Sequence, residues 1–207
     1  MTDTRALVRR KSQRASYDWQ DAADILDAAP LCHVATVRDD APVVLPMAHG
    51  RLERDLVLHG SAAAGLFRDF RNDSAVCVTA TLFDGVVLGR SARYHSMNYR
   101  SVAVHGRPVR IEQPDLVRAA LRAVVDHVVP GRWTDVRPPT PAEVRETGIW
   151  RLPIEIFSVK RREGPPLDPE EDRDLPGWTG VIPSWQAYGE PLPAAGCGGE
   201  RPPRTPR

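Results

Sequence analysis

The segment from Tyr99 to Ile111 (YRSVAVHGRPVRI) limits the fold of this chain more than any other stretch. It is rich in Val and alternates in polarity, a pattern that predicts a long β-strand with a bend near Gly106. Polar side chains gather just before it, among them His95 and Asn98. A core strand does not need such a cluster. We therefore expect this strand to form the inner wall of a small β-barrel whose entry is the rim of a ligand site.

Short strand patterns joined by tight turns fill the first third of the chain. Residues 31–38, 42–50 and 55–59 each read as a strand, and turns of a few residues separate them, which favours an antiparallel meander. No regular alternation of strand and helix is present, so a barrel is favoured over a doubly wound sheet. Further strands are expected at 75–82, 86–88 and 149–160, and helices at 19–29, 62–70, 115–128 and 140–146.

Length and composition predict one domain of ordinary size. In the 207 residues we expect a basic arm at 1–16, a folded domain at 17–190 and a disordered tail at 191–207. The net charge of +1 gives no reason to expect a nucleic-acid partner. No apolar run is long enough to span a bilayer, and no apolar stretch follows the basic N-terminus as in a secretory signal. Three scattered Cys fit a reduced, cytoplasmic protein without a disulfide framework. Because no apolar run could span a bilayer, no membrane partner is expected.

The tripeptide His59-Gly60-Ser61 is the first candidate site. We expect a strand to end here and a helix to begin with Ser61 near its cap. The free N–H groups and the positive dipole end of a helix start are suited to a phosphate, and Arg68 on that helix can add charge. The alternative is an ordinary strand-to-helix turn with a Ser cap, in which His59 is a hydrogen-bonded structural residue.

The second candidate site is the polar rim before the long strand. Hydroxyl and amide groups can bind the polar edge of a planar ligand, and Arg100 can hold an anion in a bidentate fork. The alternative is a polar hairpin loop with Arg100 on the surface. Spacings typical of zinc ligands are absent, so no metal site is predicted. The rim residues are His95, Ser96, Asn98, Tyr99, Arg100 and Ser101.

Four segments carry a resemblance to a known family. They are PMAHGRLERDLVLHGSAAAG (46–65), DGVVLGRSARYHSMNYRSVAVHGR (84–107), PGRW (130–133) and LPIEIFSVKRREGPPLD (152–168). On these motifs the chain resembles the pyridoxamine 5′-phosphate oxidase-like proteins of the FMN-binding split-barrel superfamily, in the branch that includes nitroimidazole-resistance-type proteins. The resemblance implies a mainly β, α+β fold: a six- to seven-stranded antiparallel split β-barrel with flanking helices.

The resemblance also implies a homodimer with FMN at the subunit interface. In family terms His59, Gly60 and Ser61 carry the phosphate, with Arg68 as a helper. The start of the long strand, at Asn98, Tyr99, Arg100 and Ser101, touches the isoalloxazine and ribityl groups. In nitroimidazole-resistance-type relatives a His at the strand end sits beside the flavin, and His59 matches it.

The function expected from this resemblance is an FMN-dependent oxidoreductase acting on a small molecule, for example a nitro-compound reductase. His59 or Tyr99 would donate a proton to the reduced substrate. Trp150-Arg151-Leu152 is similar to the substrate-gripping ending of true pyridoxamine phosphate oxidases, but here the chain continues through a strand and a Pro-rich tail. Vitamin B6 chemistry is therefore not expected. The alternatives are a non-catalytic flavin or haem binding and sensing protein, and a barrel that binds a deazaflavin.

Overall fold

A computed structural model describes residues 3–197 of the chain. The described residues fall into two compact units, each assembled from segments that are distant in sequence. Unit 1 comprises residues 3–29, 79–104 and 156–186, and unit 2 comprises residues 30–78, 105–155 and 187–197. The predicted fold class, a mainly β arrangement of split-barrel type with flanking helices, is confirmed, although the described residues hold eleven strands rather than six or seven.

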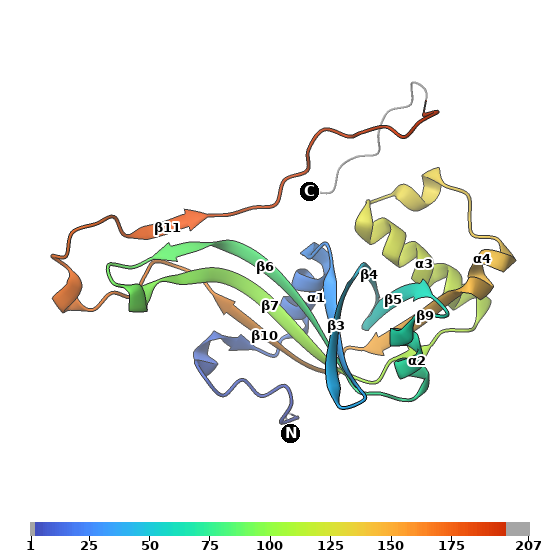
Figure 1. The fold of residues 1–207 in the computed structure, drawn as a ribbon, viewed down its shortest axis with the longest axis horizontal. Coiled ribbons are helices and arrows are strands. Elements are labelled where there is room, and N and C mark those ends of the chain that lie inside the picture. Colours follow the sequence, from blue (N-terminus) through green and yellow to red (C-terminus); the bar gives the residue numbers. More distant parts are fainter. Residues whose placement is uncertain (1–2, 198–207) are drawn as a thin grey trace. The chain divides into compact units, whose positions relative to one another are not determined.

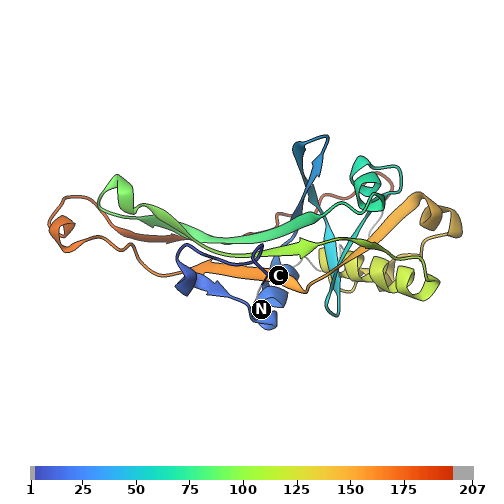
Figure 2. The same ribbon diagram turned by 90° about the horizontal axis from the view of Figure 1, so that it is seen from below.

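Unit 1 is built on a sheet in which the strands lie in the order β1-β10-β7-β6, with β11 along β6 (Figure 1). Seen from below, the long green strands β6 and β7 curve along each other (Figure 2). A turn was expected at 83–85, but β6 runs through it as one strand. The bounds are η1 (Ser12–Arg14), β1 (Ala15–Ser16), α1 (Trp19–Ala28), β6 (Val76–Leu88), η2 (Ala92–Tyr94), β7 (Ser96–Gly106), β10 (Ile156–Arg162), η4 (Glu170–Asp172) and β11 (Gly180–Pro183).

The end of the N-terminal arm is part of this sheet. Strand β1 pairs antiparallel with β10, placing Ala15 opposite Lys160. Helix α1 follows as predicted, because the Asp18 side chain accepts a hydrogen bond from the Gln20 N–H at 2.7 Å and caps the first turn. The ring of Trp19 on α1 then meets Phe157 of β10 edge-on.

Unit 2 contains a second sheet, in the order β4-β5-β9-β8, covered by helix α3. Side chains of α3 and of this sheet make its core: Val57, Ile111, Val117, Ala120, Val124 and Ile149. The bounds are β2 (Cys32–Arg38), β3 (Ala41–Met47), β4 (His49–Leu52), β5 (Asp55–Ser61), α2 (Gly65–Arg71), β8 (Val109–Arg110), α3 (Pro114–Val128), η3 (Arg132–Asp135), α4 (Pro141–Glu146) and β9 (Thr147–Pro153).

Strands β2 and β3 pair antiparallel over seven residues. In an antiparallel pair, directly opposite residues point to the same face. His33, Ala35 and Val37 on β2 therefore share a face with Pro46, Val44 and Pro42 on β3. Val37 and Val44 expose 62% and 56% of their surface, so this apolar face is uncovered in the described chain.

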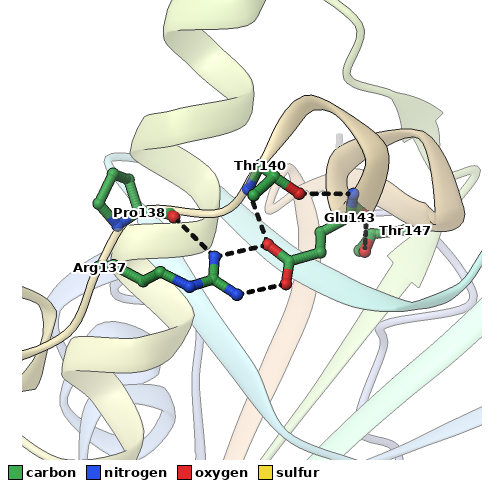
Figure 3. A network of polar contacts seen from close by, with 5 residues as sticks. All are labelled: Arg137, Pro138, Thr140, Glu143 and Thr147. Atoms are coloured by element: carbon green, nitrogen blue, oxygen red, sulfur yellow. Dashed lines mark hydrogen bonds and ion pairs between the residues drawn. The ribbon is translucent and has the colours of Figure 1, made fainter.

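Helix α4 begins with a reciprocal cap, shown in Figure 3. Thr140 Oγ1 accepts a hydrogen bond from the Glu143 N–H, and the Glu143 carboxylate accepts one from the Thr140 N–H at 2.7 Å. Arg137 donates to both oxygens of the same carboxylate, at 2.8 and 2.6 Å. These hydrogen bonds, above all those from Arg137, lower the pKa of Glu143 to about 2. The sequence predicted this helix because Thr140-Pro141 is a typical helix start.

Two further features bear on the expectations from sequence. No helix among residues 3–197 is long and apolar enough to cross a membrane. The three cysteines are free, and burial raises the pKa of the Cys32 thiol to about 12, which makes it unreactive. Of the tail expected to be disordered, residues 198–207 lie outside the described residues.

Candidate functional site

The tripeptide His59-Gly60-Ser61 lies on β5, where it pairs with β9 as His59 opposite Ile149, Gly60 opposite Gly148 and Ser61 opposite Thr147. The strand was expected to end at His59 and the helix to begin at Ala62 with a Ser cap. Both predicted boundaries are wrong. Strand β5 continues to Ser61 because its hydrogen-bonded pairing with β9 extends that far. Helix α2 begins at Gly65, with Ala64 as its cap.

Gly60 and Gly148 allow α2 to pack closely on the two strands. A Cβ at Gly60 would lie 3.2 Å from Phe67 Cε2, and one at Gly148 would lie 2.7 Å from Phe67 Cδ2. The Phe67 ring belongs to a buried cluster with Phe70 and Trp150, at centroid distances of 5.4 and 6.2 Å. Gly60 thus has a packing role that does not depend on any ligand.

The polar groups of this segment are partly exposed. Ser61 is exposed, and its Oγ accepts a hydrogen bond from the Ala63 N–H at 3.3 Å. Arg68 is exposed on α2, and its guanidinium forms no ion pair with any described residue. His59 is half-buried, and this burial lowers the pKa of its imidazole. These groups are therefore accessible to an anion, and the imidazole is mainly neutral at pH 7.

Reasoning from sequence missed an ion pair beside this segment. Arg38 donates to both carboxylate oxygens of the buried Asp69, from Nε to Oδ1 at 3.2 Å and from Nη2 to Oδ2 at 2.7 Å. A Cβ at Gly65 would lie 3.1 Å from Arg38 Nη2, so the guanidinium lies against the first turn of α2. Nothing local in the sequence links residues on β2 and α2, and the pair could not be predicted from spacing.

The second candidate group lies at the start of β7, in unit 1. Successive side chains of a strand point to opposite faces. Asn98 and Arg100 therefore lie on one face of β7, and Tyr99 and Ser101 on the other. Asn98 is buried, Arg100 is exposed, and Tyr99 and Ser101 are half-buried. A ligand on one face of the strand would meet one of these pairs of side chains directly.

Arg100 and Ser101 already have partners within unit 1. Arg100 donates two hydrogen bonds to the Asp84 carboxylate, at 3.0 and 2.7 Å, so its fork already holds an anion. Ser101 Oγ donates to the Lys160 carbonyl at 3.2 Å. His95, also predicted for the rim, is exposed, and its Nδ1 lies 3.0 Å from the Ser91 carbonyl oxygen.

Asn98 contacts a cation that the sequence did not single out. Its Oδ1 accepts a hydrogen bond from Arg162, and its Nδ2 donates to the Gly164 carbonyl at 3.2 Å. Arg162 is the last residue of β10 and is buried. In the sequence it lies in the basic run Lys160-Arg161-Arg162, where no pattern separates it from its exposed neighbour Arg161.

The predicted site residues thus form two groups, one in each compact unit. Unit 2 brings His59, Gly60 and Ser61 together on β5, with Arg68 on the helix that follows. Unit 1 places Asn98, Tyr99, Arg100 and Ser101 along β7. That the two groups bind one flavin stays a prediction, as do the proton-donor roles of His59 and Tyr99.

Comparisons with known proteins place the chain in a family. The profile of the pyridoxamine 5′-phosphate oxidase family matches residues 18–161. The flavocytochrome Anf3 from Azotobacter vinelandii has a similar structure, with a TM-score of 0.89 and 36% identity over 97% of this chain and 93% of its own. The FAD and haem binding protein from Mycobacterium smegmatis gives a TM-score of 0.87 and 36% identity over 92% and 94% of the two chains.

A more distant structure shares the fold alone. It is a protein from Bacteroides thetaiotaomicron classed with 5-nitroimidazole antibiotic resistance, with a TM-score of 0.61 and 24% identity over 70% of this chain and 85% of its own. A comparison with curated proteins gave no match. The resemblance inferred from the sequence motifs is confirmed by the family profile and by these structures.

Proposed function

Because the chain belongs to the pyridoxamine 5′-phosphate oxidase family, we propose that it is a flavin- and haem-binding oxidoreductase. The proposal is carried by the 36% identity, over nearly the whole chain, to a flavocytochrome and to an FAD and haem binding protein. For the flavin we propose FAD, because one of these relatives is named for it. FMN, implied by the sequence motifs, is the alternative that the experiment below distinguishes.

A bound flavin would supply hydride chemistry and a bound haem would supply single-electron transfer. In unit 2 the candidate flavin residues are those on β5 and α2, and the start of β7, in unit 1, is a separate candidate group. The unit 2 group fits an anionic nucleotide: Ser61 and Arg68 are exposed, and Arg68 is free of a carboxylate partner within residues 3–197. Arg100 fits this role less well, because Asp84 already occupies its fork.

The residue we propose for haem is His33. It lies opposite Pro46 on the uncovered apolar face of the β2–β3 hairpin, the face that also carries Val44 and Val37. A porphyrin needs apolar contacts for its ring and an imidazole for its iron, and this face offers both in one unit. His33 itself is exposed, so its imidazole is accessible to an iron.

The test is the absorption spectrum of the freshly purified protein, followed by identification of any released chromophore by mass. We expect flavin bands together with a Soret band, and FAD rather than FMN in the extract. His33→Ala should lose the Soret band and keep the flavin, and His59→Ala is the matched control that should keep the haem. A protein that stays colourless after incubation with FAD, FMN and haemin would refute the proposal.

The reaction is a narrower proposal within this function. We propose that the loaded protein oxidises NADH or NADPH and passes the electrons to a small acceptor such as a nitroaromatic compound. Tyr99 and His59 are the proposed proton donors. Burial keeps most of the His59 imidazole neutral, so Tyr99→Phe should lower turnover more than His59→Ala while both variants keep the flavin. Turnover equal to wild type in both variants would remove these two roles.

We also propose that the protein is a homodimer in which a second copy covers the apolar face of the β2–β3 hairpin. Strand β3 pairs with β2 alone among the described strands, so its other edge is open. Open edges with apolar side chains are ready surfaces for association. A cofactor held at His33 would then lie at the subunit interface.

A further inference from the structure

Arg71, the last residue of α2, reaches back to the loop that follows Ser61. Its Nη1 donates a hydrogen bond to the Ala62 carbonyl at 3.1 Å. Side chains of a helix lean toward its N-terminus, so the direction of α2 carries this guanidinium toward the loop. Arg71 is exposed, and its side chain has no other partner among residues 3–197. One of its five N–H donors is used, and four are available beside the loop.

The loop itself is held in place by backbone contacts within unit 2. The Ala62 N–H donates to the Glu146 carbonyl at 2.9 Å, and the Ala64 N–H donates to the Ser61 carbonyl at 2.9 Å. Ser61 Oγ accepts a hydrogen bond from the Ala63 N–H at 3.3 Å. Because Oγ acts as an acceptor here, its own hydrogen can be donated to a ligand. The loop therefore presents a fixed, exposed hydroxyl on the same segment that Arg71 contacts.

The charge of Arg71 has no counter-charge among the described residues. The two carboxylates nearest to it in sequence already have cations of their own. Asp69 pairs with Arg38 at 2.7 Å, and Asp73 pairs with Arg107 at 3.2 Å. An exposed guanidinium that is positioned by a neutral carbonyl, and whose neighbouring acids are occupied, is available to an anion from solution.

This geometry separates Arg71 from Arg68, the cation that the sequence singles out. Arg68 is also exposed on α2, but no hydrogen bond or ion pair joins its side chain to the loop or to any other residue in 3–197. Only the bond from Arg71 to Ala62 fixes a charged side chain of α2 at the loop.

We propose that Arg71, rather than Arg68, is the specificity-determining cation of an oxyanion subsite that it forms with the Ser61 hydroxyl. This subsite selects phosphorylated flavins over riboflavin, because a guanidinium binds phosphate oxygens through charge-assisted hydrogen bonds. The inference rests on the proposed function for the identity of the ligand. Both side chains belong to unit 2, as do the other candidate flavin residues on β5 and α2.

The first experiment uses inorganic diphosphate, so that it does not depend on the cofactor. Each protein is dialysed to remove any flavin carried through purification, and the affinity for diphosphate is measured by calorimetry at constant ionic strength. Arg71→Gln should bind about tenfold more weakly than the wild type, because one charge-assisted contact is lost. Arg71→Lys keeps the charge but loses the planar fork, and its affinity should lie between the two.

Arg118→Gln is the matched control for this titration. Arg118 lies on α3, is exposed like Arg71 and has no ion pair among residues 3–197. Its substitution removes the same charge from unit 2 at a position outside the candidate site. Arg118→Gln should bind diphosphate like the wild type, and Arg68→Gln should lose less affinity than Arg71→Gln.

The second experiment identifies the oxyanion and separates binding from loop structure. The affinities for riboflavin, FMN and FAD are compared between the wild type and Arg71→Gln by quenching of flavin fluorescence. Weaker binding of FMN and FAD with riboflavin unchanged assigns the subsite to the phosphate on the ribityl chain, which both nucleotides share. Weaker binding of FAD alone assigns it to the second phosphate of FAD. If Arg71 only tethered the loop, riboflavin binding would fall as far as FMN binding.

The inference is overturned if riboflavin binding falls in this way, or if Arg71→Gln binds diphosphate as the wild type does. A wild type without affinity for diphosphate, an equal loss in Arg118→Gln, or a larger loss in Arg68→Gln than in Arg71→Gln would overturn it as well. If the protein binds no flavin, the proposed function fails. The diphosphate titration then still decides whether Arg71 forms an oxyanion subsite.

Discussion

The carboxylate of Asp69 lies buried on α2 against the fork of Arg38, and its side chain exposes 8% of its surface. Such a pair contributes little by its Coulomb energy alone, because both groups lose water when they are buried. Removal of one partner is costly, since the other then remains desolvated without a counter-charge. The packing of α2 on β2 is therefore stable only when both Arg38 and Asp69 are present.

Asp69→Asn should therefore lower the free energy of unfolding by about 2 kcal/mol, a value below that of fully buried pairs because Arg38 is partly solvated. Urea unfolding measures it. The control is Glu170→Gln, which breaks the exposed pair with Arg173 and should change stability by less than about 0.5 kcal/mol. Equal effects of the two substitutions would contradict this account.

His59 gives a second prediction for a single side chain, on pH. Burial lowers the pKa of its imidazole below 6.5, so the folded protein takes up this proton less readily than the unfolded chain. Stability should thus fall as the pH drops below about 6.5 and level off below the lowered pKa. His59→Gln should make the decline between about pH 7.5 and 5.5 shallower. Urea midpoints at several pH values test this, and parallel curves for both proteins would refute it.

At the scale of elements, helix α2 lies on β5 and β9 through the aromatic cluster of Phe67, Phe70 and Trp150. The close approach requires a residue without a side chain on each strand, at Gly60 and Gly148. The segment that the sequence predicts to bind a phosphate is therefore also a packing surface, and the two roles are compatible because Ser61 is left exposed.

Gly148→Ala should destabilise the protein by about 2 kcal/mol, because its Cβ would meet the Phe67 ring, which the cluster holds in place. Thermal and urea unfolding measure the loss. Gly189→Ala is the control: a Cβ there meets nothing within 4 Å, and stability should stay within about 0.5 kcal/mol. A Gly148 variant as stable as this control would show that α2 moves freely over the sheet.

At the scale of the whole molecule, the proposed dimer predicts a change in mass. The wild type should elute as a dimer in size-exclusion chromatography with light scattering. Val44→Lys places a charge in the apolar face of the hairpin and should shift the protein to the monomer. Leu192→Lys, at a residue that is 94% exposed, is the control and should leave the dimer intact. A wild type that is monomeric at every concentration would end the proposal.

The features that could be predicted from the amino-acid sequence are those with local causes. Asp18 predicts the start of α1, and the Thr140-Pro141 start with Glu143 predicts α4, because capping acts within a few residues. Alternating Val-rich runs predict strands for the same reason. The family followed from motifs in fixed order, so the split-barrel fold could be inferred from the sequence, while the roles of the candidate site residues stay predictions.

The partner of each polar side chain, in contrast, depends on the tertiary structure. The sequence predicts that the Arg100 guanidinium is available to bind an anion, yet it forms an ion pair with Asp84, sixteen residues away in the chain. The sequence predicts that Asn98 contacts a flavin, yet its side chain accepts a hydrogen bond from Arg162, sixty-four residues away in the chain. The end of β5 was misplaced because its ladder with β9 lies far along the chain. Such pairings are set by how strands cross in space, and no local periodicity encodes them.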